Sequence, residues 1–364
     1  MKIKVNTEAI LDGLQKVQSV INPRNALPVL SNVLIRAADN KLELTATDMD
    51  LTVRATVPAE VLEPGVTTLP AKRILGVFRE LSVDEVEMEV NKENIAFIHA
   101  ASSYFRIHGI PETDYPLLPE MGDAKRYSFD QAAFRNMLKL TGYGASPDPN
   151  RSLLHGVLLS FKAGKLSVVA TDSRRLALVE HDSEFPADAE MDMILPLKTV
   201  EELVRTLGES GTVTILATQQ QAAFEFDGTL VISKLVEGTY PNFRQVIPQA
   251  TGERVALERE TFLTAVRRTS QLVSDAVSGV KLTFTTNRLE VLAAATEIGE
   301  GRETLDVKYS GPDVAISFNP AFLMDPLKAL TTDEVFLDLI DDTSPGVIRS
   351  TINFVYVLMP IRVT

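Results

Sequence analysis

Apolar residues recur at helical spacing in six separate stretches of the chain. In residues 71–81, for example, Ile74 and Phe78 fall on one side of a helix, and Lys72 and Arg79 fall on the other. Apolar positions three and four residues apart form the face by which an amphipathic helix packs on a sheet. The same pattern predicts helices over residues 7–20, 71–81, 130–143, 197–207, 259–272 and 320–330.

Strand-like runs follow the predicted helices. Leu42–Ala46 and Leu51–Val57 flank the turn sequence Thr-Asp-Met-Asp, which is typical of a β-hairpin. Leu166–Ala170 and Leu176–Glu180 flank Thr-Asp-Ser-Arg-Arg in the same way. The runs VDEVEMEV, GTVTILA and DEVFLDL follow the second, fourth and sixth helices. Because the first turn of a helix tolerates a missing N–H, we expect these three helices to begin at Pro70, Pro196 and Pro320.

The predicted elements occur three times in the same order. The markers Leu81, Leu207 and Leu330 are separated by 126 and 123 residues, a period of domain size. Proline-bearing connectors at Asp114–Arg126 and Thr239–Arg254 separate the copies. The sequence therefore predicts an α+β protein with three tandem domains, each made of two helices packed on antiparallel sheets. The expected domains are residues 1–121, 122–250 and 251–364.

Composition narrows the class of protein. An apolar content of 45% is ordinary for a globular protein, and no apolar run approaches the roughly 20 residues that a membrane helix needs. The N-terminus lacks the apolar region of a signal peptide, and the chain has no cysteine. We therefore expect a cytoplasmic protein without membrane contact, disulfides or thiolate metal sites.

Positive charge is concentrated on the repeated helices. The chain carries a net charge of −13, but the six predicted helices together carry +4, which leaves −17 for the rest. Lysines and arginines on helices often serve only solubility. Their recurrence on equivalent helices of an acidic chain instead favours a surface that faces nucleic-acid phosphates without reading sequence. The candidate DNA-binding residues on these helices are Lys72, Arg73, Arg79, Arg135, Lys139, Lys198, Arg205, Arg267, Arg268 and Lys328.

Signatures of catalysis and cofactor binding are missing. The four histidines are dispersed, and none forms a pair at metal-ligand spacing. The chain has no phosphate-binding glycine loop and no nucleophile elbow. Neighbouring carboxylates such as Asp341 and Asp342 are typical of turns. We expect no enzyme activity, metal or cofactor.

Five passages together carry a family resemblance: LPVLSNVLI, LTATDMDL, VVATDSRRLAL, SKLVEGTYPNFRQVIP and YVLMPIRVT. In this order, in a chain with a threefold repeat, they resemble the bacterial DNA polymerase III β subunits, the sliding clamps. The resemblance covers the full length. It implies three clamp domains per chain and a head-to-tail homodimer that forms a six-domain ring around duplex DNA.

The resemblance also implies a dimer interface between free strand edges of the first and third domains. Phe105 and Ile107 of one subunit would meet Leu272 of the other. Read alone, Phe105 and Ile107 are more typical of core residues of a strand. Acidic residues of the third domain are expected to face basic residues such as Arg106. These acidic residues are Glu297, Glu300 and Glu303.

A second implied site is an apolar pocket between domains two and three, which receives short peptide motifs with a Gln followed by Leu- and Phe-type anchors. The matching residues are Leu154, Thr171, Ser173, Arg174, Arg175, Leu176, Pro241, Val246, Val357, Met359, Pro360, Ile361 and Arg362. Arg175 and Arg362 could contact peptide carbonyls or carboxylates. Read alone, VYVLM could be a final core strand. Ser173 and Arg174 replace the Gly-His of the family's best-known member, which makes the rim more basic.

For DNA contact, the resemblance points to Arg24, which matches a DNA-contacting arginine of the family. The loop Gly144–Leu154 departs from the pattern, because Asp148, Ser152 and Leu153 stand where that member has a glutamine and two tyrosines. We therefore do not carry DNA contact over to this loop.

The function implied by the resemblance is that of a non-enzymatic processivity factor, which holds a polymerase near the primer end while sliding along double-stranded DNA. The implied partners are the replicative DNA polymerase, the clamp loader, translesion polymerases, mismatch-repair proteins and ligase. The implied location is the cytoplasm, in association with the nucleoid. Two rivals stay open: an enzyme of unrecognised type, which needs a cavity with convergent titratable groups, and a protein-interaction scaffold without DNA.

Overall fold

The computed structural model describes residues 1–364 except for 22–26, 120, 249–251, 273–278, 296–298 and 362–364. The chain divides into two compact units. The first comprises Met1–Arg135 and Glu201–Leu235, and the second comprises Asn136–Val200 and the chain from Val236 onward. Each unit is described by itself.

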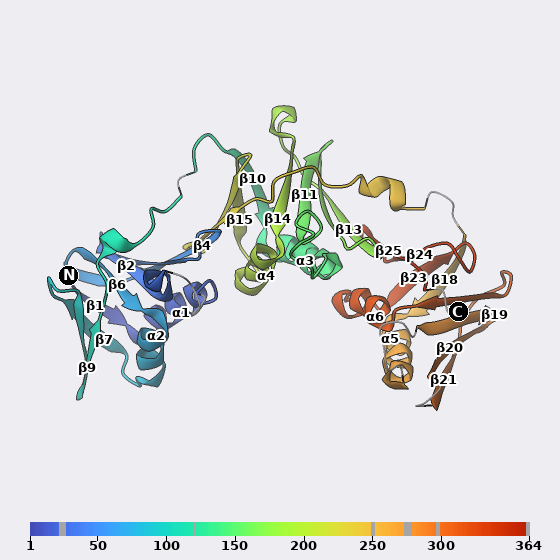
Figure 1. The fold of residues 1–364 in the computed structure, drawn as a ribbon, viewed down its shortest axis with the longest axis horizontal. Helices are drawn as coiled ribbons and strands as arrows, with labels where there is room; N and C mark the ends of the chain where they lie inside the picture. The colour runs from blue at the N-terminus through green and yellow to red at the C-terminus, as the bar shows by residue number, and fades with distance from the viewer. Residues whose placement is uncertain (22–26, 120, 249–251, 273–278, 296–298, 362–364) are drawn as a thin grey trace. The chain divides into compact units, whose positions relative to one another are not determined.

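One pattern of a strand, a helix and three more strands occurs six times, twice in each copy of the repeat (Figure 1). The helices are α1 (Thr7–Gln18), α2 (Ala71–Glu80), α3 (Gln131–Thr141), α4 (Leu197–Thr206), α5 (Arg259–Thr269) and α6 (Pro320–Ala329). All six lie where the sequence predicts them.

The strands of the N-terminal copy are β1 (Lys2–Asn6), β2 (Asn32–Ala38), β3 (Lys41–Thr47), β4 (Leu51–Pro58), β5 (Glu60–Glu63), β6 (Gly65–Pro70), β7 (Glu85–Val90), β8 (Ile95–Ala100) and β9 (Ser103–His108). Those of the central copy are β10 (Lys125–Asp130), β11 (Gly156–Lys162), β12 (Lys165–Thr171), β13 (Arg175–Asp182), β14 (Met191–Pro196), β15 (Thr212–Ala217), β16 (Gln221–Phe226) and β17 (Thr229–Lys234). Those of the C-terminal copy are β18 (Glu253–Glu258), β19 (Val280–Thr285), β20 (Arg288–Ala295), β21 (Gly299–Asp306), β22 (Val314–Phe318), β23 (Glu334–Leu339), β24 (Gly346–Arg349) and β25 (Phe354–Leu358).

Polar residues at the strand–helix boundaries start several helices. The side chain of Asn6 accepts a hydrogen bond from the Ala9 N–H at 3.0 Å, and Asn319 accepts one from Ala321 at 2.9 Å. Such caps satisfy N–H groups that the first helical turn leaves unpaired.

The expectation that three helices begin at prolines is correct only for Pro320, the first residue of α6. It is wrong for the other two prolines, because Pro70 ends β6 and Pro196 ends β14, where they lie opposite Asn32 and Gly156.

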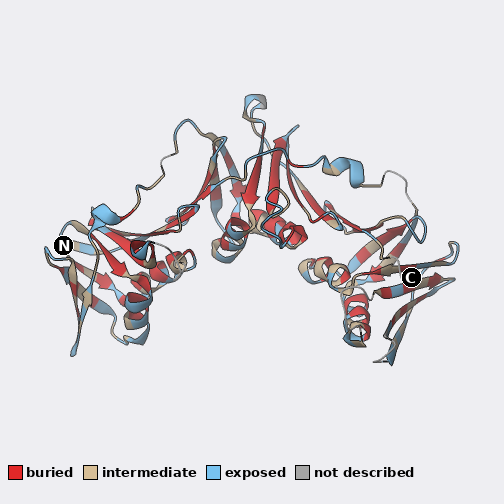
Figure 2. Ribbon diagram, in the orientation of Figure 1, coloured by how far each residue is buried: buried red, intermediate tan, exposed pale blue. Residues whose placement is uncertain are grey.

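Each helix buries the side that its apolar spacing predicts. Ile74 and Phe78 of α2 are fully buried, as are Ile10 and Leu14 of α1, while Lys72 is exposed. In Figure 2 the buried residues concentrate on the strands and on the helix sides next to them. Among the described residues, no helix is long and apolar enough to cross a membrane.

The copies join through pairs formed by the third strands that follow the helices. β4 of the N-terminal copy pairs with β17 of the central copy, and this pair continues one eight-stranded sheet. β13 of the central copy pairs with β25 of the C-terminal copy in a second eight-stranded sheet. The remaining two of these third strands, β9 and β21, form edges of the five-stranded and four-stranded sheets, and neither has a further strand partner within the described part of the chain.

Two glycines allow a matched test of this packing. A Cβ on Gly109, which follows β9, would come within 2.3 Å of the Thr68 carbonyl oxygen, whereas a Cβ on Gly76 of α2 would meet no atom within 4 Å. We expect Gly109→Ala to lower the free energy of unfolding by about 1–3 kcal/mol through overpacking. Gly76→Ala should raise it by about 1 kcal/mol, because alanine favours a helix. Calorimetric unfolding of both variants checks this, and equal effects would contradict the described packing at Gly109.

Candidate functional site

The junction between the central and C-terminal copies assembles most of the predicted pocket residues. Leu176 of β13 lies opposite Val357 of β25 in the strand pair. Beyond the end of β25, the Met359 N–H donates to the Arg174 carbonyl oxygen at 2.9 Å. Residues 150 or more positions apart in the sequence therefore meet at one place.

Beneath this junction lies an apolar cluster. Its buried members are Leu158, Val169, Leu176, Leu178, Ile194, Tyr240 and Val357, and Leu153, Leu154, Val236, Phe243, Ile247 and Val355 pack against them. Two large apolar side chains at the same junction, Val246 and Met359, are exposed, and Met359 is 45% exposed. We call Leu154, Phe243, Val246 and Met359, with the cluster below them, the second-junction surface.

Sequence reasoning found Leu154, Leu176 and Val357 of this cluster but missed Tyr240 and Phe243. The signal was available, because the TYPNF segment repeats the DYPLL segment of the first copy. The hydroxyl of Tyr240 accepts a hydrogen bond from the Thr171 N–H at 3.1 Å and so fixes the connector to β12. Burial raises the pKa of Tyr240, so its hydroxyl stays protonated.

The turn between β12 and β13 has a defined geometry. The Asp172 carboxylate accepts hydrogen bonds from the N–H groups of Arg174 at 2.8 Å and Arg175 at 3.0 Å. Ser173 lies between them with a φ of +78°, a left-handed conformation that glycine usually adopts. Arg151 donates to the Ser173 hydroxyl and to the Asp172 carbonyl oxygen. The loop that departs from the family pattern therefore braces this turn.

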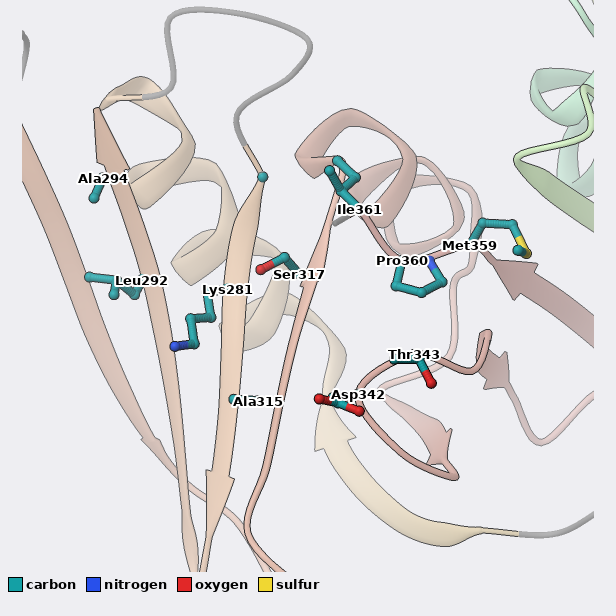
Figure 3. Close-up of a pocket in the computed structure, with 11 residues that line it drawn as sticks. Lys281, Leu292, Ala294, Ala315, Ser317, Asp342, Thr343, Met359, Pro360 and Ile361 are labelled. Carbon is teal, nitrogen blue, oxygen red and sulfur yellow. The ribbon is translucent and has the colours of Figure 1, made fainter. Parts of the chain in front are cut away.

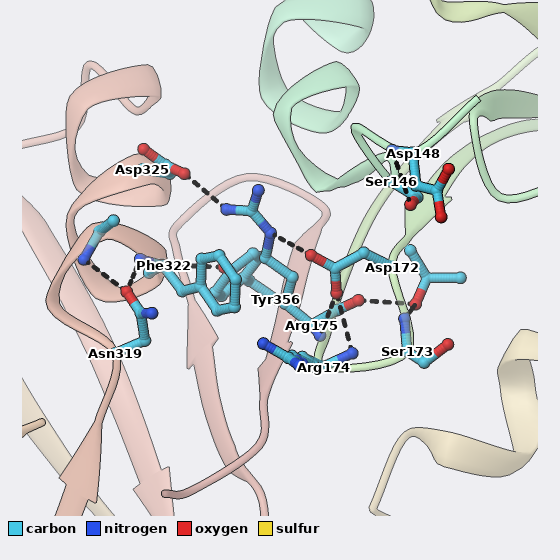
Figure 4. A network of polar contacts seen from close by, with 12 residues as sticks. Ser146, Asp148, Asp172, Ser173, Arg174, Arg175, Asn319, Phe322, Asp325 and Tyr356 are labelled. Atoms are coloured by element: carbon cyan, nitrogen blue, oxygen red, sulfur yellow. Dashed lines mark hydrogen bonds and ion pairs between the residues drawn. The ribbon is translucent and has the colours of Figure 1, made fainter. Parts of the chain in front are cut away.

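Arg175 lies inside the junction (Figure 4). Its side chain is only 9% exposed and pairs with Asp172 at 3.0 Å and with Asp325 of α6 at 2.5 Å. Its guanidinium carbon is 4.1 Å from the centre of the Phe322 ring. The Tyr356 hydroxyl donates to the Phe322 carbonyl oxygen at 2.8 Å. Arg175 thus joins the central copy to α6 of the C-terminal copy.

A groove with a volume of about 770 Å³ lies between the segment that follows β25 and strands β19, β20 and β22 (Figure 3). Met359, Pro360 and Ile361, all predicted pocket residues, form one wall. The other lining residues are Gly279, Lys281, Leu292, Ala294, Ala315, Ser317, Asp342 and Thr343. The Ile361 N–H donates to the Ser317 carbonyl oxygen at 2.7 Å and holds this wall against β22.

The basic residues of the helices fall into two groups. Eight of them form the first group and are exposed: Lys72, Arg73, Arg79, Lys139, Lys198, Arg267, Arg268 and Lys328. Arg205 is exposed as well, but its contacts place it in the second group with Arg135. Arg135 is partly buried, donates to the Val204 carbonyl oxygen at 2.8 Å and pairs with Glu209. Arg205 donates to the Lys16 carbonyl oxygen at 2.8 Å and pairs with Glu202 at 2.5 Å. These two arginines are engaged within the protein.

The predicted interface residues lie at the two free edges. Phe105 and Ile107 are half-buried on β9. A Cβ on Gly301 of β21 would come within 2.9 Å of Leu272 Cδ1, so Leu272 lies against this edge. Arg302 pairs with Glu300 at 2.8 Å and Arg268 with Glu303 at 3.4 Å. Arg24, Glu297 and Arg362 lie outside the described residues.

No group of three His, Cys, Asp or Glu residues could hold a metal ion in the part of the chain that the structure describes.

Comparisons with known proteins give one family over the whole chain. The models of the DNA polymerase III beta subunit match as follows: the N-terminal domain residues 1–119, the central domain residues 128–242 and the C-terminal domain residues 244–362. The beta sliding clamp of Chlamydia muridarum is 33% identical over 100% of this chain and 99% of its own length. That of Pseudomonas aeruginosa is 31% identical, with complete coverage of both chains.

Solved structures agree with the sequence comparisons. The sliding clamp of Bacillus subtilis matches with a TM-score of 0.96 at 26% identity. A sliding clamp (DNA polymerase III subunit beta) from Pseudomonas aeruginosa bound to griselimycin matches with a TM-score of 0.96 at 30% identity. Both matches cover 100% of both chains.

The position of Arg175 gives a testable prediction. Arg175→Ala would leave the Asp172 and Asp325 carboxylates without their cation. We expect the free energy of unfolding to fall by about 3 kcal/mol. This is the lower end of the range for breaking a buried ion pair, because Asp325 is partly exposed. Arg174→Ala removes an exposed arginine from the same turn and should cost less than about 0.5 kcal/mol. Calorimetric unfolding compares the two. Equal stability of both variants would show that the junction does not depend on Arg175.

Proposed function

Because the chain belongs to the DNA polymerase III beta-subunit family, we propose that it works as a sliding clamp, a non-catalytic processivity factor that encircles duplex DNA. The observation that carries the proposal is the way in which the six equivalent third strands are paired. Four of them pair in two joins between copies, and β9 and β21 remain as unlike edges at the two ends of the series. Unpaired sheet edges attract partner strands. The domain division proposed for the chain remains 1–121, 122–250 and 251–364.

The proposed assembly is a head-to-tail homodimer in which β9 of each subunit pairs with β21 of the other. Such a contact joins unlike surfaces and makes a closed ring when the rotation between subunits closes. Phe105 and Ile107 would meet Leu272 across each join, with Arg106 near the acidic residues Glu300 and Glu303. Two joins of this kind would cover every third-strand edge of the dimer.

The proposed DNA contacts are the exposed basic residues of the helices, together with Arg24. They would interact with phosphates, often through water, and so would bind without sequence preference. The rest of the chain is acidic, which disfavours DNA elsewhere. Arg135 and Arg205 are left out of this contact set, because their guanidinium groups already donate to the carbonyl oxygens of Val204 and Lys16 on neighbouring helices.

The proposed clients dock on the second-junction surface by short linear motifs. Exposed Val246 and Met359 over an apolar cluster suit leucine and aromatic anchors, and Arg174 on the turn suits an acidic flank. Arg175 would shape this surface from below. The proposed clients are the replicative and translesion polymerases, the clamp loader, mismatch-repair proteins and ligase, in the cytoplasm at the nucleoid.

Topological retention on DNA tests the function directly. Protein loaded onto nicked circular DNA by a clamp loader should remain bound in high salt, because a closed ring does not depend on ionic contacts. Linearising the circle should release it, since the ring slides off the ends. Gel filtration of the DNA-bound fraction measures both states. Equal loss from circular and linear DNA would contradict encirclement and favour a scaffold that works without it.

The native mass tests the join between β9 and β21. We expect the wild-type particle at twice 39.9 kDa. Ile107→Asp places an unpaired charge at the proposed interface and should shift the particle to the monomer mass. Leu62→Asp, on the exposed strand β5 at the other edge of the same sheet, is the matched control and should remain dimeric. Analytical ultracentrifugation separates these outcomes, and a monomeric wild type would contradict the proposed dimeric ring.

A further inference from the structure

The first copy repeats the turn on which the second-junction surface is built. Thr47 Oγ1 donates to the Leu51 carbonyl oxygen at 3.1 Å, and Asp48 accepts from the N–H groups of Asp50 at 3.0 Å and Leu51 at 2.8 Å. These are the bonds that Thr171 and Asp172 make in the central copy. Met49 has a φ of +79°, against +78° for Ser173.

The surroundings of this turn are repeated as well. After β17 pairs with β4, the Lys234 N–H donates to the Asp50 carbonyl oxygen at 2.9 Å. After β25 pairs with β13, the Met359 N–H donates to the Arg174 carbonyl oxygen at the same distance. The connector also has a tyrosine at the position that corresponds to Tyr240. The hydroxyl of this residue, Tyr115, donates to the Thr45 carbonyl oxygen at 3.2 Å. The junction between the first two copies is therefore built like the second one.

This first junction also has an apolar cluster. Val29, Leu34 and Tyr115 are buried in it, and Val66, Ile110 and Leu118 pack against them. Large apolar side chains on the segments around it are exposed: Leu27, Met49 at 51% and Leu117 at 99%. Leu117 has the highest exposed fraction of these, although a leucine gains by burial. We call Leu27, Met49, Leu117 and the cluster below them the first-junction surface.

The two surfaces differ in charge. The turn 47–51 and the connector 110–119 hold four carboxylates and no base, and Lys234 pairs with one of these carboxylates, Asp50, at 2.9 Å. The corresponding turn 171–175 and connector 235–247 hold three arginines and two carboxylates. Arg175 is buried in its ion pairs, so the exposed cations there are Arg174 and Arg244. A ligand with apolar anchors would therefore need opposite flanking charges at the two places.

We propose that the first-junction surface is a second peptide-binding site. Its occupant is a short extended segment of another protein with leucine or aromatic anchors flanked by lysines or arginines. The anchors would cover Met49 and Leu117, and the basic flanks would face Asp48, Asp50, Glu112 and Asp114. The proposal uses the chemistry proposed for the second-junction surface, but it concerns different residues and stands or falls separately.

Methionines at both surfaces provide the measurement. The full-length protein is labelled with ¹³C-methyl methionine, and the signals of Met49 and Met359 are assigned with Met49→Leu and Met359→Leu. Two synthetic peptides of about nine residues are titrated, each with one leucine and one phenylalanine. One carries lysines around these anchors and the other carries aspartates at the same positions.

The lysine peptide should shift the Met49 signal and leave that of Met359 unchanged. Leu117→Ser should weaken its binding at least fivefold, while Val246→Ser in the second-junction surface should not change it. Both substituted residues are exposed, so the fold should tolerate both changes. Binding should also fall as salt is raised.

The proposal is overturned if the lysine peptide leaves Met49 unshifted at millimolar concentration, or if Leu117→Ser does not change its affinity. A shift of Met359 by the aspartate peptide tests the client site of the proposed function. Its presence or absence does not bear on Met49, so the failure of one proposal can be told from the failure of the other.

Discussion

Hydrogen bonding along the third strands is the constraint on which the rest of the structure depends. A strand at the edge of a sheet exposes N–H and C=O groups that need partners. β4 and β17 meet this need for each other, and β13 and β25 do the same, so that two eight-stranded sheets run across the joins between copies. Apolar clusters, connectors and turns then gather where the strands meet.

The sequence predicted the regular elements well, because their cause is local. Apolar spacing located all six helices, and the turn residues between Leu42–Ala46 and Leu51–Val57 located the β3–β4 hairpin. The misplaced helix starts at Pro70 and Pro196 have a local cause too. A proline fits the last position of a strand as well as the first turn of a helix, and here strand pairing decides.

The candidate site was only partly predictable, because its contacts are distant in sequence. Leu176 and Val357 followed from the family resemblance, but the burial of Arg175 depends on Asp325 and Phe322, about 150 positions away. The corresponding position in the first copy is Leu51, which is buried without any ion pair. One repeated position thus holds either a leucine or an arginine, and the arginine takes its partners from its own copy and from the neighbouring one.

The equivalence of the joins has a consequence for how such a protein can be divided into chains. β4–β17 and β13–β25 link copies within one polypeptide by hydrogen bonds that need no covalent connection between the paired strands. A covalent linker adds effective concentration to such a join. The points at which the polypeptide begins and ends are therefore not set by the fold of the copies. The same architecture could be cut into chains of one, two or three copies and keep every strand partner.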